Sequence, residues 1–287
     1  MRAAAIFGLG TSPADLKPFQ SESATEWSHG LPASSADADA VLIFGGDGTI
    51  HRHLPALLRL QIPLLIVPAG SGNDFARALN LRSTRDSARA WQAFESGKIQ
   101  ARAIDLGVIV PSAAPERIHY FCGVAGCGLD SAAARRANQM PRWLRGHGGY
   151  ALALLPLLLN LPIFSMRLIQ LNSEDRAEAD GLTLLAAFAN TPFYGGGMRI
   201  APEADFADGQ LDICRIGKLS PLRLLSMFPT VYSGRHLRLP EVEYSRADRV
   251  AVHTDTPIDI YADGEFVCQT PAELSVAARA LQVIMPA

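Results

Sequence analysis

The sequence predicts two domains, an α/β domain over residues 1–98 and a mainly β domain over residues 99–287. In the first part, apolar runs that end in small residues, typical of buried parallel strands, alternate with segments of helical periodicity. After residue 98 the pattern changes to short strand-like runs separated by turn residues, which is typical of an antiparallel sandwich. We also allow for a last strand that returns to the first domain.

The composition fits a globular protein with a substantial core. Hydrophobic residues make up 48% of the 287 positions and charged residues 19%. The net charge of −2 provides no basic surface, so nucleic acid is not expected as a partner. The four cysteines form no CxxC pair and are expected to be buried, reduced thiols. The N-terminus lacks the long apolar core of a signal peptide, which favours a cytoplasmic protein.

The first domain is predicted to contain a parallel sheet with crossover helices. Its strands are expected at 3–7, 40–44 and 63–67, and its helices near 50–60, 72–80 and 85–96. Residues 8–39 are rich in Ser, Ala, Asp and Pro and show little periodicity, so no helix is predicted there.

The second domain is predicted from a series of strand-like segments and two helical ones. The strand-like segments are 101–110, 118–128, 165–172, 181–190, 211–219, 249–254, 257–269 and 281–286, and the helical stretches are 129–160, in pieces, and roughly 220–233. The apolar segment 150–164 is shorter than the ~20 residues of a membrane-spanning helix, and two prolines interrupt it. It is expected either to face lipid or to form a buried core helix.

The stretch "FGGDGTIHRHL", residues 44–54, lies at a strand-to-helix turn. Gly45, Gly46 and Gly48 allow a close approach of the backbone, and N–H groups at a helix N-terminus bind phosphate readily. Asp47 would repel an anion there unless a cation lies between them, and Mg²⁺ is the usual choice. The alternative is a glycine-rich turn in which Asp47 is a helix cap.

A second glycine-rich turn lies in "PLLIVPAGSGNDFARALN", residues 63–80. Gly70, Ser71 and Gly72 form the turn, and Asn73 or Asp74 can cap the following helix. Adjacent parallel strands would place both turns at the same carboxyl edge of the sheet, where ligands bind.

An Asp-Gly pair in "IDIYADGEFVCQ", residues 258–269, predicts a β-hairpin. A carboxylate near its tip, Glu265, can project from the sheet and take a proton from an alcohol. The alternative for Asp263 and Glu265 is turn chemistry and a solvated charge.

These motifs together resemble the diacylglycerol kinase catalytic-domain family, which includes bacterial lipid kinases and is related to sphingosine and ceramide kinases. "GGDGT" at 45–49 is followed by "PAGSGNDFAR" at 68–77. The likeness covers about residues 40–287 and continues through "IDLGVI" at 104–109, "GCGLDSA" at 126–132, "YGGGMRIAPEADFADGQLDI" at 194–213 and "DGE" at 263–265. NAD kinases share a turn like "GGDGT", whereas the longer motifs favour the lipid kinases.

The resemblance implies an NAD kinase/diacylglycerol kinase-like fold in which the first domain binds ATP and the lipid hydroxyl enters between the domains. It implies that Asp47 and Asp74 belong to a Mg²⁺ and phosphate network and that Glu265 is the general base. The residues that it assigns to the nucleotide are Gly45, Gly46, Asp47, Gly48, Thr49, Ser71 and Gly72. It also implies a structural Mg²⁺ held by the Asp208 carboxylate and the carbonyls of Asp205 and Gln210.

The chain departs from the family pattern near its start. It reads "IFGLGTSP" where the family has an Asn-Pro-x-Ser/Ala-Gly turn, and only 44 residues precede the first Gly-Gly. The family's early threonine contact is not identified, and Thr25 would be an arbitrary choice. His51 and Arg52 replace the Asn-Glu of the family. Arg52 is expected on the helix surface and His51 in a capping or packing role.

The expected function is an ATP- and Mg²⁺-dependent lipid kinase that transfers the γ-phosphate to a hydroxyl of a lipid such as diacylglycerol. The alternatives are an NAD-kinase-like or other small-alcohol kinase and a non-catalytic nucleotide-binding regulator. The expected partners are a lipid substrate at the inner face of a membrane and a second copy in a homodimer.

Overall fold

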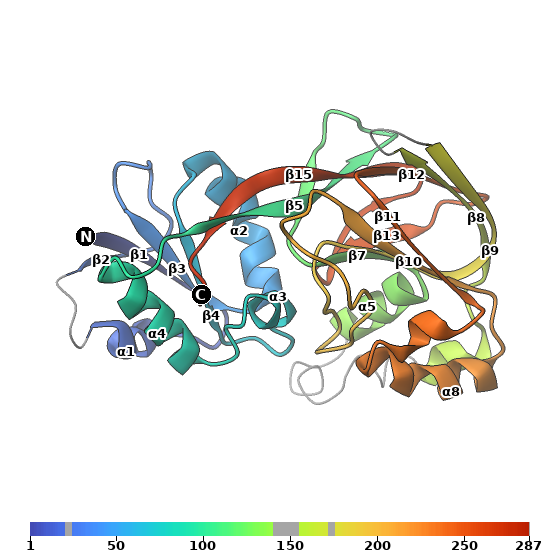
Figure 1. The fold of residues 1–287 in the computed structure, drawn as a ribbon, viewed down its shortest axis with the longest axis horizontal. Helices are drawn as coiled ribbons and strands as arrows, with labels where there is room; N and C mark the ends of the chain where they lie inside the picture. The colour runs from blue at the N-terminus through green and yellow to red at the C-terminus, as the bar shows by residue number, and fades with distance from the viewer. Residues whose placement is uncertain (21–24, 140–154, 172–175, 287) are drawn as a thin grey trace. The chain divides into compact units, whose positions relative to one another are not determined.

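The computed structural model describes residues 1–20, 25–139, 155–171 and 176–286 (Figure 1). The chain divides into two compact units, the first formed by Met1–Asp105 with Ala278–Ala287 and the second by Leu106–Ala277. Strands β5 (Arg102–Pro111) and β15 (Ala272–Val283) therefore contribute residues to both. The sequence-based boundary after residue 98 falls seven residues before the boundary in the structure.

The first unit is built on a parallel sheet. Its strands, in the order β4-β3-β1-β2, are β4 (Leu64–Pro68), β3 (Ala40–Gly45), β1 (Arg2–Phe7) and β2 (Glu26–His29). Val41 pairs with Leu64, and Ala3 pairs with Ala40. All six residues of β3 are buried, as the continuous apolar run predicts for a central parallel strand. The end of β15 joins the sheet through a parallel pairing of Val283 with Leu64.

The helices of the first unit follow the expected order. They are α2 (Asp47–Leu60), α3 (Asp74–Ala78) and α4 (Thr84–Glu95). Helix α3 is shorter than the segment predicted at 72–80, because Asn73 has a left-handed backbone (φ 53°) and the residue after Ala78 leaves the helix. In α4 the indole of Trp91 is fully buried and packs against Trp27 of β2, with ring centroids 5.3 Å apart.

Residues 8–39 contain short elements that the sequence does not predict. These are the 3₁₀ helix η1 (Pro13–Leu16), the single-turn helix α1 (Lys17–Gln20) and strand β2. Strand β2 reads "EWSH" and lies at the edge of the sheet with an almost entirely exposed pattern. An edge strand with one apolar side chain carries no hydrophobic periodicity, which explains why it was missed.

The second unit is mainly β, and strand β9 (Arg176–Ala189) lies at its centre. The other strands are β6 (His119–Phe121), β7 (Val124–Gly128), β8 (Phe164–Leu171), β10 (Leu211–Gly217), β11 (Val242–Ala247), β12 (Arg249–Thr254), β13 (Asp259–Ala262) and β14 (Glu265–Gln269). Strand β9 pairs with β7, β8 and β10, and every one of these pairings is antiparallel. Strand β11, paired with β10, was not predicted, because its sequence "VEYSRA" is half polar.

From residue 185 to residue 189, the side chains of β9 alternate between two cores. Leu185, Ala187 and Ala189 belong to one hydrophobic cluster, whereas Ala186 and Phe188 belong to the other. Such alternation places both faces of the strand in packed layers, as in a sandwich. The predicted fold class, an α/β domain followed by a sandwich-like β domain, is therefore confirmed.

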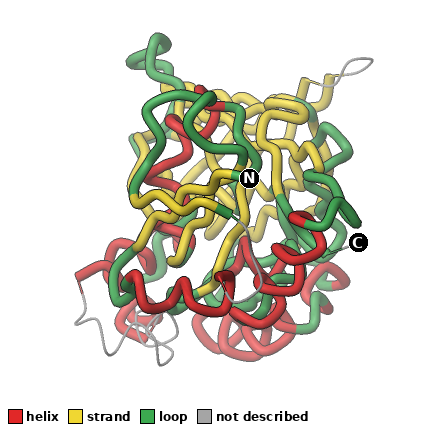
Figure 2. The backbone as a smooth tube through the Cα atoms, turned by 90° about the vertical axis from the view of Figure 1, so that its left-hand side faces the viewer, coloured by secondary structure: helices red, strands yellow, loops and turns green. Residues whose placement is uncertain are grey.

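Three helical elements of the second unit pack on the first of these clusters. They are α5 (Leu129–Gln139), the 3₁₀ helix η2 (Leu155–Leu159) and α8 (Pro221–Tyr232). Helices α5 and α8 are labelled in Figure 1, and Figure 2 distinguishes the helices of the chain, in red, from its strands, in yellow. The predicted helical stretch 129–160 is thus present at both ends, and its middle, 140–154, lies outside the described residues. So does the beginning of the apolar segment 150–164. Among the described residues, no helix has the length and apolar character needed to cross a bilayer.

The cysteines match the expectation except that Cys268 is only partly buried. None of the four takes part in a disulfide within the described residues, and Cys122, Cys127 and Cys214 are buried. Burial raises the pKa of the Cys127 and Cys214 thiols to about 12 and that of Cys268 to about 11. The thiols are therefore protonated, with low nucleophilicity at neutral pH.

Gly107 of β5 offers a test of the packing in the second unit. A Cβ at this position would lie 2.0–2.4 Å from the ring of Phe121, which is fully buried. We expect Gly107→Ala to destabilise the protein by about 1–3 kcal/mol, because the ring has no room to yield. The measurement is the midpoint of thermal unfolding.

Gly217→Ala is the matched control, because its Cβ would meet no atom closer than 3.6 Å. In the Gly107→Ala background, Phe121→Leu removes the clashing ring edge, so the two changes together should cost less than the sum of their separate effects. Equal midpoints for Gly107→Ala and Gly217→Ala would show that the predicted clash is absent.

Candidate functional site

The two predicted glycine-rich turns are in direct backbone contact in the first unit. They follow the neighbouring strands β3 and β4, and Ala69 N donates a hydrogen bond of 3.0 Å to Gly45 O. A Cβ at Gly46 would lie 2.8 Å from Gly70 Cα, and one at Gly70 would lie 2.5 Å from Gly46 Cα. Only glycine permits this approach at both positions, which gives a physical reason for the two Gly-rich motifs.

A third turn, after β1, joins the other two. Gly8 N donates to Phe44 O at 2.7 Å, and the hydroxyl of Thr11 donates to Gly8 O at 2.8 Å. The side chain of Thr49, in the first turn of α2, lies over both Gly8 and Gly45, where an added Cβ would come within 2.7 Å of its Oγ1. No residue of this turn was predicted to belong to the site. Its signal was a glycine directly after the first parallel strand.

Asp47 links the two glycine-rich turns. It is the first residue of α2, yet its carboxylate accepts hydrogen bonds from the backbone N–H groups of Asp74 and Phe75, each at 3.1 Å. These are the first two residues of α3, so Asp47 caps the next helix along the chain. Asn73 occupies the N-cap position of α3, as expected, but its side chain makes no capping hydrogen bond. The Asn73 side chain instead closes the turn through both of its polar atoms, bonded to the N–H and carbonyl of Gly70.

The carboxylates of Asp47 and Asp74 approach one point. A Cβ built on Gly72 would lie 3.1 Å from Asp47 Oδ2 and 3.5 Å from Asp74 Oδ2. Asp74 is buried, and its Oδ1 pairs with the guanidinium of Arg77 one turn along α3. Arg77 therefore offsets part of the negative charge and orients the carboxylate. The predicted pair of carboxylates is thus brought together within the first unit.

The geometry of this edge fits a phosphate-bearing ligand together with a cation. Helix α2 begins here, and the first N–H groups of any α-helix lack intrahelical acceptors. Gly46 and Gly70 bring the backbone close, and Ser71 is exposed in the turn between β4 and α3. Each carboxylate oxygen carries two lone pairs, so the oxygens of Asp47 can accept the α3 N–H groups and still ligate a metal ion.

Glu265 lies in the second unit, at the start of β14. The predicted hairpin is present: Ala262 pairs with Glu265, and the two residues between them have left-handed backbones, with φ 51° at Asp263 and 85° at Gly264. Two consecutive residues with positive φ define a type I′ turn, for which Asp-Gly is strongly preferred. The Glu265 side chain is exposed.

Asp263 anchors this hairpin: it lies in the turn, as the alternative of turn chemistry expects, and its carboxylate also binds a neighbouring loop. Its Oδ2 accepts a hydrogen bond from Cys122 N at 2.9 Å and its Oδ1 accepts one from Gly123 N at 2.8 Å. Asn190 ties the same loop from the other side by donating from Nδ2 to Cys122 O. Bonds to two backbone donors fix the turn, and with it the position of the Glu265 backbone.

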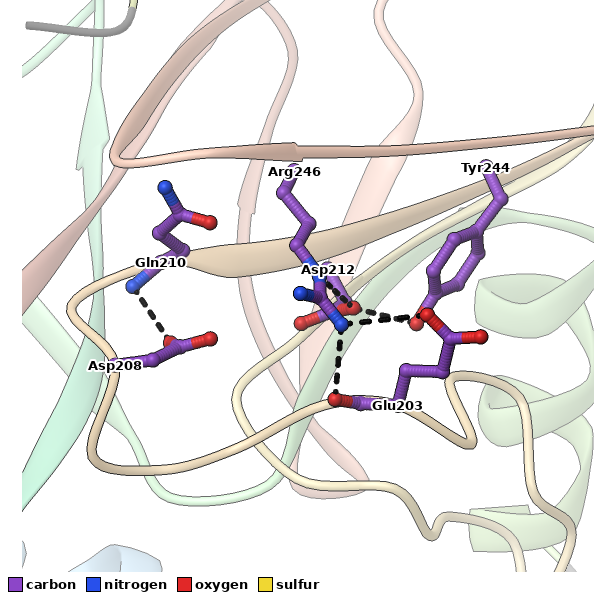
Figure 3. A network of polar contacts seen from close by, with 6 residues as sticks. All are labelled: Glu203, Asp208, Gln210, Asp212, Tyr244 and Arg246. Atoms are coloured by element: carbon purple, nitrogen blue, oxygen red, sulfur yellow. Dashed lines mark hydrogen bonds and ion pairs between the residues drawn. The ribbon is translucent and has the colours of Figure 1, made fainter.

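The predicted metal loop lies between β9 and β10 of the second unit. Asp208 Oδ1 accepts a hydrogen bond from Gln210 N, and Asp205 Oδ1 accepts one from Ala207 N, both at 3.0 Å (Figure 3 shows the first). Burial raises the pKa of Asp208, and the nearby carboxylates of Asp212 and Asp205 raise it further. The hydrogen bond from Gln210 N and the charge of Arg246 act in the opposite direction, so the loop gathers carboxylates whose charge is partly compensated.

Asp212, beside this loop, has one satisfied and one unsatisfied oxygen. Its Oδ1 accepts hydrogen bonds from Tyr244 Oη and from Arg246 Nε (Figure 3). Arg246 also donates, from Nη2, to the backbone carbonyl and the carboxylate of Glu203. Its Oδ2 is buried and has no hydrogen-bond partner in the described structure. An orphaned carboxylate oxygen near Asp208 fits a bound cation. No group of three or more His, Cys, Asp or Glu side chains arranged for a metal was found among the described residues, so backbone carbonyls and water would have to complete such a site.

Arg52, His51 and Thr25 have local roles. Arg52 is exposed on α2, as expected, and His51 is partly buried there. Thr25 is buried, and its hydroxyl donates to Glu95 Oε1 at 2.5 Å, which ties it to the end of α4.

Comparison with known proteins places both units in one family. Residues 14–109 match the diacylglycerol kinase catalytic domain, and residues 123–285 match the YegS C-terminal NAD kinase beta sandwich-like domain. A diacylglycerol kinase from Mycobacterium tuberculosis is 42% identical over 260 residues, which cover 90% of this chain and 81% of that protein. A diacylglycerol kinase from Bacillus subtilis is 26% identical over 88% of this chain and 80% of its own length.

Solved structures show the same fold. Two crystal structures from Bacillus anthracis str. Sterne, the second that of a diacylglycerol kinase, give TM-scores of 0.75 and 0.68 at 17% and 16% identity. Each alignment covers 99% of this chain and 97% of the other. With both halves matched and more than two thirds of a 42% identical relative covered, the chain belongs to the diacylglycerol kinase family and is a lipid-kinase-type enzyme.

Proposed function

We propose that this kinase uses ATP and Mg²⁺ and transfers the γ-phosphate to a hydroxyl of a lipid of the diacylglycerol type. The relatives named diacylglycerol kinase support the acceptor class. The observation that carries the nucleotide half of the proposal is the junction of the two glycine-rich turns, where Asp47 reaches from α2 to cap α3.

The chain's own residues supply position and charge at this junction. Gly46 and Gly70 keep the backbone accessible, and the N-terminus of α2 provides oriented N–H groups for phosphate oxygens. Asp47 and Asp74 would hold the cation, with Asp74 oriented by Arg77. When bound, Mg²⁺ would neutralise the charge that develops on the transferred phosphoryl group.

Glu265 would act as the general base of the reaction. The role requires a carboxylate that is held in place and accessible to an alcohol. The anchored type I′ turn holds its backbone, and the exposed side chain is accessible. Its function would be to accept the proton of the acceptor hydroxyl as the phosphoryl group is transferred.

The first experiment measures the transfer of labelled phosphate from ATP to acceptors in mixed micelles. The acceptors are diacylglycerol, phosphatidylglycerol, sphingosine, ceramide, undecaprenol and NAD. We expect label in a lipid, and we expect Glu265→Gln to reduce the rate by about 10²–10⁴-fold with ATP binding retained, because the base is lost and the shape is kept.

Glu116→Gln is the matched control, since Glu116 is an exposed glutamate of the same unit (72%) with only a weak pair to Arg117. If label appears only in NAD, the acceptor is NAD and the proposed lipid acceptor is wrong. Undiminished transfer by Glu265→Gln would remove this residue from the mechanism.

Asp47→Asn and Asp74→Asn separate helix capping from cation binding. Asn at 47 keeps one acceptor oxygen, so we expect a loss of about 1 kcal/mol in stability together with a large rise in the Mg²⁺ concentration needed for activity. Asp74→Asn removes no helix cap, but it weakens the buried ion pair with Arg77, so we expect a loss of stability together with a higher Mg²⁺ requirement and a lower rate. If Asp47→Asn lowers the unfolding midpoint and leaves the Mg²⁺ dependence unaltered, Asp47 is a cap alone.

The loop at Asp208 is tested without turnover. Mg²⁺ that binds the folded loop should raise the unfolding midpoint, and Asp208→Asn should remove most of this increase. Asp205→Asn is the matched control, because Asp205 is proposed to contribute only its carbonyl. An equal Mg²⁺ response in wild type and Asp208→Asn would show that the carboxylate holds no ion.

A further inference from the structure

Helix α8 presents two different apolar faces. Leu224, Met227 and Val231 recur at helical spacing and are buried in a hydrophobic cluster of the second unit. On the opposite face of the helix, Leu222, Leu225, Pro229 and Tyr232 also recur at i, i+3, i+7 and i+10. We call these four residues the outer stripe. A helix that packs on a core by one face needs apolar residues on that face only.

The outer stripe is exposed. The exposed fraction is 80% for Leu222, 49% for Leu225 and 47% for Tyr232. Leu159 of η2, a helix that packs into the same hydrophobic cluster as α8, is 92% exposed. Single exposed leucines are common, whereas a periodic row of them marks a binding surface.

The sequence segment that contains the outer stripe has basic residues but no acidic ones. No Asp or Glu occurs between Asp212 and Glu241, while five basic residues do. Arg215 and Arg223 are paired with Glu243 and Glu241. The other three, Lys218, Arg235 and Arg238, flank the two ends of α8, are exposed, and form no ion pair within the described part of the chain.

We propose that the outer stripe and these three cations dock the protein on an anionic lipid bilayer, with α8 lying in the plane of the interface. An apolar stripe flanked by exposed basic residues is the pattern of interfacial helices, in which the side chains enter the acyl boundary and the cations meet acidic headgroups. Two prolines and a length of twelve residues suit a helix that lies on a membrane and does not cross it.

Charge argues for a bilayer over a second copy of the chain. A two-fold interface through the stripe would bring α8 against α8 and place Lys218, Arg235 and Arg238 near the same cations of the other copy. An anionic surface complements these charges. The inference is independent of the proposed phosphoryl transfer, because docking is measured with no nucleotide present.

The test is sedimentation of the full chain with sucrose-loaded vesicles of phosphatidylglycerol and phosphatidylcholine, compared with phosphatidylcholine alone. We expect binding to the anionic vesicles that weakens with salt. The variant Leu222→Ser/Leu225→Ser should bind about tenfold or more weakly, and Lys218→Gln/Arg235→Gln/Arg238→Gln should bind about tenfold more weakly with a flatter salt dependence.

Leu182→Ser is the matched control, because Leu182 is similarly exposed (52%) but lies on β9. It should bind as wild type does. In a second measurement, Leu222→Trp should shift its emission to the blue when anionic vesicles are added, and Leu182→Trp should not. Thermal unfolding checks that the exposed substitutions leave the fold intact.

Three outcomes would overturn the proposal. The first is that the wild-type protein does not bind the vesicles. The second is that Leu222→Ser/Leu225→Ser binds the vesicles as tightly as wild type does. The third is that this variant loses self-association but not vesicle binding, which would assign the stripe to a second copy.

Discussion

The contact on which the first unit's site depends is the backbone approach of Gly46 to Gly70, stabilised by the carboxylate of Asp47. Adjacent parallel strands bring two turns to one edge of a sheet, but side chains normally keep the turns apart. Two glycines remove this barrier, and one aspartate spans the space to satisfy two N–H groups at the start of α3. The position of Asp74 and Gly72 follows, because both belong to the turn and helix that Asp47 holds.

The proposed cation binding by Asp47 makes the same demands on the side chain as its observed capping role. As a cap it needs to be ionised and fixed, and as a cation ligand it needs the same two properties. The second unit also contains a carboxylate that is fixed by backbone donors. Asp263 is fixed by the N–H groups of Cys122 and Gly123, and the neighbouring Glu265 is left exposed. In both units a carboxylate that binds backbone donors orders the segment beside it.

The features that could be predicted from the sequence are those with a local cause. The all-apolar β3 and β4, the Asp-Gly hairpin and the glycine-rich turns each follow from a few neighbouring residues. The capping of α3 by Asp47 joins residues 27 and 28 positions apart, so no local pattern could reveal it. The same holds for Asp263 and its donors, which are about 140 positions apart. Strands β2 and β11 were missed because edge and half-polar strands lack a hydrophobic period.

Strand β15, which contributes residues to both units, affects the order in which the sheets are completed during synthesis. One edge of β4 pairs with β3, and the other receives Val283 and Ile284, both in the last five residues of the chain. During synthesis the first unit emerges first, yet this edge stays without its strand until the ribosome has finished the entire second unit. The sheet of the first unit is therefore completed only by residues that follow the second unit in the chain, and a fragment that stops after Asp105 lacks a strand of its own sheet.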